Sequence, residues 1–274
     1  MNPSTLPADI RIGTVHLRVR DLEAQVSFYE EVLGFFRLAE DGATAVLGTA
    51  EDPSPLLVLH ASAGAPVRGP GTTGLFHVAF RVPTRADLGG MIQRIRGHRY
   101  TIDGFADHNV SEAVYLADPE GNGLELYVDR ARDVWHGVDG GIYMTTEPLD
   151  LPGLLLAGPR PAPRLPEGTV VGHIHLRVST LAGAEAFYVE RLGFDVTTRS
   201  YPGALFVSAG GYHHHVGLNV WGGEGARPPE EGSLGLVSFD LVVPSADARR
   251  RILGGAEVGT IPDPDHVGVR IAGP

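Results

Sequence analysis

Apolar and polar residues alternate along this chain in short, regular blocks. Residues 15–19 follow the pattern of a strand with one buried face. Asp21 then stands where a helix N-cap is favoured, and Gly34 where a helix end is favoured. Short apolar runs follow at 45–47 and 56–59, separated by Gly, Pro and Asp. Between the two helix signals, apolar side chains recur at helical spacing: Leu22, Val26, Tyr29 and Leu33. The pattern predicts a β-α-β-β-β unit.

The same order of elements recurs along the chain. Residues 15–35 and 174–194 share the sequence H-L-R-V, then F-Y, then L-G-F, at a constant offset of 159. Residues 74–84 and 235–245 form a second related pair, and Thr84 and Ser245 each stand where a further helix should begin. Self-similarity at a fixed period indicates duplication. We therefore predict an α+β fold of four βαβββ units in two pairs, each pair forming a mixed sheet.

The repeat divides the chain into two halves. We predict an N-terminal domain over 1–130, a connector over 131–168 and a C-terminal domain over 169–274. The connector holds the proline-rich run 159–166, which favours irregular backbone. The chain ends abruptly with V-R-I-A-G-P, a predicted strand at a sheet edge. An uncovered edge invites pairing with another chain, so a homo-oligomer is one hypothesis for the assembly.

Composition excludes several classes of function. The 274 residues are 43% hydrophobic with a mean hydropathy of +0.00, which is typical of a soluble globular protein. No apolar run is long enough for a membrane span and no signal peptide is evident, so a cytoplasmic location is expected. The absence of cysteine excludes disulfides and thiolate chemistry. A net charge of -11 without a basic cluster argues against nucleic-acid binding.

The segment from His108 to Glu125, H-N-V-S-E-A-V-Y-L-A-D-P-E-G-N-G-L-E, carries the clearest chemical signal. Residues 118–123 are typical of a tight turn, and Glu125 falls in the apolar strand that follows. A carboxylate on a half-buried strand is costly unless it is paired, and a metal ion is the usual partner. The order His, Tyr, Asp-Pro-x-Gly, Glu resembles the signature of extradiol ring-cleavage dioxygenases of the vicinal-oxygen-chelate superfamily, with Ala106 as the one departure.

This resemblance implies a fold, a metal and a set of ligands. The fold is the vicinal-oxygen-chelate fold, in which paired units curl their strands into a cup, and the subgroup is that of catechol 2,3-dioxygenase. Carried onto this chain, the ligands are His16, His77 and Glu125, each flanked by apolar residues in a predicted strand. A lone strand histidine is usually a core residue, but the joint placement favours a metal. Two histidines and one carboxylate suit Fe(II), and Mn(II) also fits.

The same resemblance gives His108 and Tyr115 catalytic roles. They would line the substrate pocket, contact the bound catecholate and move a proton during ring opening. The implied partners are a small aromatic diol and O2.

The metal site does not recur in the second half under this mapping. His175 is kept, but Ser238 matches His77 and Arg270 matches Glu125, and a cation cannot replace a carboxylate ligand. The C-terminal half is therefore predicted to pack and shape the pocket. The run from His213 to His215 leaves three interpretations open: contact across a domain or subunit boundary, a second metal site with His175, or a structural role. By the same resemblance, the large extradiol enzymes have a histidine that acts as a general acid-base in the strand to which this run would correspond.

The leading hypothesis is an Fe(II)-dependent extradiol dioxygenase acting on a catechol-like aromatic with O2. One rival is a glyoxalase- or epimerase-like lyase of the same fold, which commonly uses four ligands. The strand that would supply the fourth, 55–61, holds no Glu, although His60 could serve. Another rival is a ligand-binding protein without metal. Replacing His77 by alanine separates the classes, because only the enzymes would lose their metal.

Overall fold

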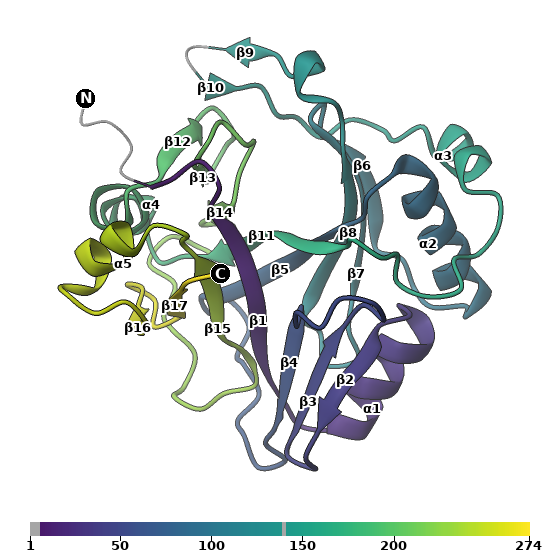
Figure 1. Cartoon of the computed structure of the whole chain (residues 1–274), viewed down its shortest axis with the longest axis horizontal. Coiled ribbons are helices and arrows are strands. Elements are labelled where there is room, and N and C mark those ends of the chain that lie inside the picture. The colour runs from purple at the N-terminus through teal and green to yellow at the C-terminus, as the bar shows by residue number, and fades with distance from the viewer. Residues whose placement is uncertain (1–5, 139–140) are drawn as a thin grey trace.

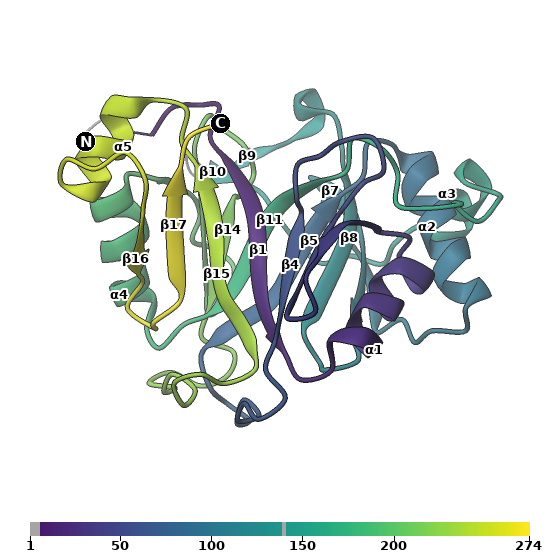
Figure 2. The same cartoon turned by 60° about the horizontal axis from the view of Figure 1, so that its bottom comes forward.

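The computed structural model describes residues 6–138 and 141–274 (Figures 1 and 2). The first half contains β1 (Arg11–Val19), α1 (Leu22–Ser27), η1 (Phe28–Val32), β2 (Phe36–Glu40), β3 (Thr44–Gly48), β4 (Leu57–Ala61), β5 (Gly74–Arg81), α2 (Arg85–Gly97), β6 (Gly104–Asp107), β7 (Ser111–Ala117) and β8 (Gly123–Asp129). The connector contains η2 (Arg132–Val134), β9 (Gly137–Val138), β10 (Gly141–Ile142) and α3 (Leu151–Ala157). The second half contains β11 (Val170–Arg177), α4 (Leu181–Glu185), η3 (Ala186–Leu192), β12 (Asp195–Thr198), β13 (Ala204–Ser208), β14 (Val216–Asn219), β15 (Gly235–Val242), α5 (Ala246–Leu253), β16 (Gly259–Pro262) and β17 (Gly268–Ala272).

Four repeated units are therefore present, as the sequence pattern predicts. The fourth is shorter, since only β16 and β17 follow its helix, whereas β6, β7 and β8 follow the helix of the second unit. The helices begin at the predicted caps. The side chains of Asp21 and Ser245 each accept a backbone N–H of the first turn. Thr84 and Asp87 form a reciprocal capping box at the start of α2.

The two sheets do not follow the predicted division into halves. One sheet has the order β16-β17-β15-β1-β4-β3-β2, and the other has the order β12-β13-β14-β11-β5-β8-β7-β6. The first unit therefore shares a sheet with the fourth, and the second shares one with the third. The joints are the antiparallel pairs β1·β15 and β5·β11. Because the four first strands are equivalent in pattern, either choice of partners would satisfy their hydrogen bonds.

The eight-stranded sheet curls around in Figure 1, and alternation along its strands separates two faces. One face is apolar and lies against α2, whose buried residues include Leu88, Met91, Ile92 and Ile95. The opposite, concave face carries the polar residues of the same strands, among them His77 on β5 and Glu125 on β8. A continuous apolar core on one side thus leaves the other side free to hold a site.

The C-terminal strand is not at a sheet edge, contrary to the sequence-based expectation. β17 pairs with β15 in parallel and with β16 in antiparallel, so β16 forms the edge (Figure 2). The strand that motivated the oligomer hypothesis is therefore already paired on both sides. Within the residues that the structure describes, no helix is both long enough and apolar enough to cross a membrane.

Each half also contains a buried tyrosine–aspartate pair that joins its two units. The Tyr29 hydroxyl donates to Asp118 at 3.2 Å, and the Tyr188 hydroxyl donates to Asp263 at 3.0 Å. Burial raises the pKa of Asp263 to about 6, although hydrogen bonds from Val267 and Tyr188 oppose this shift. The carboxyl group is thus more easily protonated in the folded chain than in the unfolded chain.

Replacing Asp263 by asparagine should change how stability depends on pH. A folded-state pKa above the unfolded value favours folding below the unfolded pKa, and this contribution is lost as the pH rises through about 6. Asparagine stays neutral and can still accept the backbone hydrogen bonds. The free energy of unfolding of Asp263→Asn relative to the native chain should therefore rise by about 1–3 kcal/mol between pH 4 and pH 7.5. Urea unfolding measures it.

The exposed Asp195 at the start of β12 offers a control. The Asp195→Asn variant should follow the native chain across the same pH range. A constant difference between Asp263→Asn and the native chain at all pH values would contradict the prediction.

Candidate metal centre and pocket

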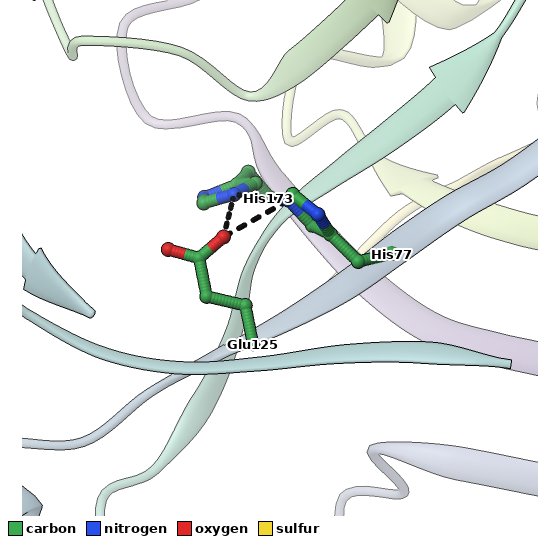
Figure 3. Close-up of side chains that lie close together, drawn as sticks. All are labelled: His77, Glu125 and His173. Atoms are coloured by element: carbon green, nitrogen blue, oxygen red, sulfur yellow. Dashed lines mark hydrogen bonds and ion pairs between the residues drawn. The ribbon is translucent and has the colours of Figure 1, made fainter. Parts of the chain in front are cut away.

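His77, Glu125 and His173 converge on one point of the concave face (Figure 3). Glu125 Oε2 lies 2.9 Å from His77 Nε2 and 3.1 Å from His173 Nε2. The two imidazole nitrogens are 3.3 Å apart. All three side chains are buried, with exposed fractions of 6%, 2% and 2%. Two nitrogens and one carboxylate oxygen therefore point at a common centre that is shielded from solvent.

Strand register explains the convergence. Ala79 on β5 lies opposite Glu125 on the parallel neighbour β8 and opposite His173 on the antiparallel neighbour β11. His77, two residues before Ala79, projects from the same face of β5. The small side chain of Ala79 leaves the space between the flanking strands open, so three longer side chains can meet above it.

Electrostatics favours the ligand forms of these groups. Burial by itself raises the pKa of Glu125, but His173 and His77 outweigh it and hold the pKa well below the usual range. Burial lowers the pKa of His173 to about 4, although Glu125 opposes that shift. Near neutral pH the site thus presents a carboxylate and a neutral His173 imidazole, as metal ligation requires. The donor atoms all lie within 4.8 Å of one another, so the residues present fit a divalent cation.

The structure does not bring His16 to this cluster. His16 lies on β1 in the seven-stranded sheet, where its Nδ1 faces His60 Nε2 at 3.2 Å and its Nε2 lies 3.7 Å from Asp240 Oδ1. His173, which the sequence analysis does not single out, takes the third position. Of the three predicted ligands, His77 and Glu125 meet and His16 does not.

Counting back from the helix caps would have found His173. In each unit one strand position stands seven residues before the N-cap: Thr14, His77, His173 and Ser238. The repeated H-L-R motif instead draws attention to His16 and His175, two residues later. Thr14 has no metal-ligand role here, since its hydroxyl donates to the Pro55 carbonyl at 3.0 Å. The seven-residue rule thus separates ligand positions from the neighbouring histidines.

The equivalent positions in the seven-stranded sheet do not form a metal site, as the comparison of the two halves of the sequence predicts. Ser238 stands at the histidine position, and Arg270 stands opposite Asp240 at the position that corresponds to Glu125. Arg270 and Asp240 form an ion pair, with Arg270 Nε 2.6 Å from Asp240 Oδ1. An internal salt bridge therefore occupies the space of the missing ligands.

A pocket of about 470 Å³ opens beside the three side chains. Tyr115 on β7 and His108, in the turn before β7, line it together with Met144 and Thr146 of the connector. His108 Nδ1 lies 2.5 Å from the Thr145 carbonyl oxygen, and its Nε2 lies 2.6 Å from the Tyr115 hydroxyl. In the neutral imidazole, Nδ1 donates to that carbonyl, so Nε2 accepts the tyrosine proton. The connector thus forms one wall of the pocket and fixes the His108 ring.

Tyr115 and Glu125 are opposite each other on neighbouring strands. Burial raises the pKa of Tyr115 well above the usual range, and the negative charge of Glu125 raises it further. The phenol is therefore held as a proton donor. His108 and Tyr115, predicted as a catalytic pair, do lie together in the pocket.

The three consecutive histidines lie in the turn between β13 and β14, not on a strand. His214 lines the pocket, with its ring centroid 4.0 Å from that of His173. His213 contacts His214 through the two Nδ1 atoms at 2.8 Å and Asp129 Oδ1 through its Nε2 at 2.9 Å. The third unit shares a sheet with the second, so this turn reaches the metal centre directly.

Comparison with known proteins gives consistent relatives. Residues 11–126 match the Glyoxalase/Bleomycin resistance protein/Dioxygenase superfamily. Catechol-2,3-dioxygenase of Bacillus subtilis (strain 168) is 44% identical over 248 residues, which cover 88% of this chain and 85% of the relative. Biphenyl-2,3-diol 1,2-dioxygenase 3 of Rhodococcus globerulus is 31% identical over 134 residues, 46% of this chain and 70% of the relative.

Solved structures share the fold across the whole chain. Glyoxalase I from Zea mays superimposes with a TM-score of 0.56 at 15% identity, covering 97% of this chain and 92% of that one. At this identity the likeness concerns the arrangement of strands and helices alone.

Proposed function

The chain belongs to the glyoxalase/bleomycin resistance/dioxygenase superfamily and is a catechol-2,3-dioxygenase homologue, and from this premise we propose that it is an Fe(II)-dependent extradiol dioxygenase. Its substrate would be a catechol-like aromatic diol, cleaved with O2 beside the two hydroxyl groups. The observation that supports this most strongly is the buried convergence of His77, Glu125 and His173 next to a pocket of about 470 Å³ that is partly lined by aromatic side chains.

We propose that these three side chains hold the metal. Bound Fe(II) supplies the redox chemistry with O2 and open positions for the diol, which is the usual use of a two-histidine, one-carboxylate set. Mn(II) suits the same donors and is the alternative ion. The cluster has three members in the described part of the chain, which favours this chemistry over a lyase with four protein ligands.

Tyr115 and His108 would act on the substrate as a hydrogen-bonded pair. The Tyr115 hydroxyl stands over the pocket with His108 Nε2 behind it, and the Thr145 carbonyl fixes the tautomer of that ring. The Tyr115 oxygen can accept a proton from a substrate hydroxyl while the tyrosine passes its own proton to His108 Nε2. The apolar wall that includes Val110, Met144 and Phe206 would exclude water from the ring.

His214 is a further candidate for proton transfer. It lines the same pocket from the side of His173, and His213 occupies its Nδ1. We propose that the remaining nitrogen, Nε2, serves as a general acid-base in this pocket.

Anaerobic loading with Fe(II), followed by catechol and air, tests the proposed function. The native chain should bind about one iron and form the yellow ring-fission product. Glu125→Gln should lose iron and product, because an amide cannot balance the charge of the cation. Glu190→Gln, at an exposed position on η3, serves as the control and should keep both. Iron bound to the native chain without cleavage of any catechol would contradict the proposed reaction.

A further inference from the structure

Arg177 and Arg68 come together beside the pocket. Arg177, at the end of β11, lines the pocket, and Arg68 stands behind it. Arg68 Nη1 and Arg177 Nη1 donate to the same acceptor, the Leu75 carbonyl oxygen, at 2.7 and 2.8 Å. Within residues 6–138 and 141–274, neither guanidinium has a carboxylate within ion-pair distance.

This arrangement differs from that of two other partly buried arginines in the chain. Arg270 is neutralised by Asp240, and Arg94 donates to a ring of backbone carbonyls, those of Glu30, Glu31, Val32, Ala162 and Pro163. Arg177 and Arg68 share a single carbonyl between two positive charges. Burial lowers the pKa of both guanidinium groups, and the charge of Arg177 lowers that of Arg68 further. Two partly buried like charges cost free energy unless an anion joins them.

The position of Arg177 relates it to the metal centre. His173, His175 and Arg177 occupy every second position along β11 and so project from the same face of the sheet. The Arg177 guanidinium carbon lies 4.8 Å from the centre of the Phe76 ring, which lies 5.1 Å from the ring of the ligand His77. One aromatic ring thus separates the guanidinium from the metal ligands. A catechol bound through its hydroxyls would extend across a similar width.

The volume of the pocket permits a substituent on the ring. At about 470 Å³ it lies within the range of roughly 300–1,000 Å³ that is typical of sites for drug-sized ligands, which are larger than an unsubstituted diol. Aromatic side chains, among them Tyr201, Phe206 and Trp221, also line the pocket. A flat ring with a short polar extension matches this lining.

We propose that the substrate is a catechol that carries a carboxylate on the side of the ring away from the diol, and that Arg177, with Arg68 behind it, binds that carboxylate. This inference rests on the proposed ring-cleavage function for the identity of the ring. Arginine suits the role because its fork of N–H donors matches a carboxylate in geometry and charge. Arg177 would then determine specificity rather than take part in the chemical step.

The test compares an acid with its neutral isostere. Iron-loaded protein is given 3,4-dihydroxyphenylacetate or 3,4-dihydroxyphenylacetamide, and kcat/KM is measured for each. Anaerobic calorimetry measures the binding of the same two compounds without turnover. The native chain should prefer the acid by at least tenfold in both measurements. Arg177→Gln should reduce that preference to near unity, and Arg177→Lys should keep part of it, because the charge remains without the fork.

Control variants separate the outcomes. Arg191→Gln, at an exposed site on η3, should keep the native ratio. Equal turnover and binding of acid and amide by the native chain would overturn the anion site but leave the proposed dioxygenase intact. Preferential anaerobic binding of the acid without cleavage of either compound would support the anion site and count against the proposed reaction. If Arg177→Gln lowered kcat/KM and binding affinity for the acid and the amide in equal proportion, this would also overturn the inference.

Discussion

Replacing His173 by alanine should remove the bound metal, whereas replacing His16 by alanine should leave it in place. His173 Nε2 lies 3.1 Å from Glu125 Oε2 in the cluster, while His16 lies in the other sheet beside His60 and Asp240. Loss of a direct ligand should weaken affinity by more than the roughly 10–100-fold that loss of an outer-shell partner costs. Iron per chain after dialysis and the turnover of catechol measure the effect.

A matched variant tests whether burial alone explains the result. His175 is buried on the same face of β11, with an exposed fraction of 4%, but does not belong to the three-residue cluster. His175→Ala should therefore keep its metal, although its pocket changes. Loss of iron in His16→Ala with retention in His173→Ala would restore the ligand set predicted from sequence and refute the structural one.

Replacing Gly123 by alanine should destabilise the protein strongly. Gly123 begins β8, and a Cβ atom there would lie 2.0 Å from the Phe76 carbonyl oxygen on β5 and 3.2 Å from His77 Cβ. The first contact is with backbone, so the two central strands would have to move apart. We expect a loss on the order of 3 kcal/mol in the free energy of unfolding. Urea unfolding measures it, and metal affinity should fall with it because His77 would shift.

Gly104 at the start of β6 provides the comparison. A Cβ atom there meets nothing within 4 Å, and the backbone is not in the left-handed region. Gly104→Ala should thus change the free energy of unfolding by less than about 0.5 kcal/mol. Equal stabilities of Gly123→Ala and Gly104→Ala would show that β5 and β8 can separate at little cost.

Much of the fold could be predicted because local signals agree with each other. Asp21, Thr84 and Ser245 cap helices where a polar residue precedes an apolar helical pattern. These caps mark where the helix begins in three of the units. The sequence also predicts that His77 and Glu125 belong to one site, through the family resemblance and because each is a polar residue flanked by apolar ones in a predicted strand. Such features depend on residues close in sequence.

The third ligand and the sheet pairing depend on distant contacts. The offset of 159 aligns His16 with His175, and a strand pattern repeats every two residues, so His173 and His175 fit the same face equally well. Apart from the seven-residue spacing to the helix N-cap, only the register of β11 against β5, with His173 opposite Ala79, decides which ring reaches Glu125. The hydrophobic pattern likewise does not determine that β5 pairs with β11, because β1 and β15 present equivalent strand edges that could also serve as partners. Repeats are easy to detect, but their partners are hard to assign.

The crossing of the sheets has a consequence for biosynthesis. A nascent chain that has emerged as far as β8 already carries His77 and Glu125, but β11 with His173 is still to be made. Two of three ligands cannot hold the ion with the affinity of the complete set. Capture of the proposed metal would therefore wait until the third unit has left the ribosome and paired with β5. A redox-active ion would then enter only when the strands that surround it are ready to close around it.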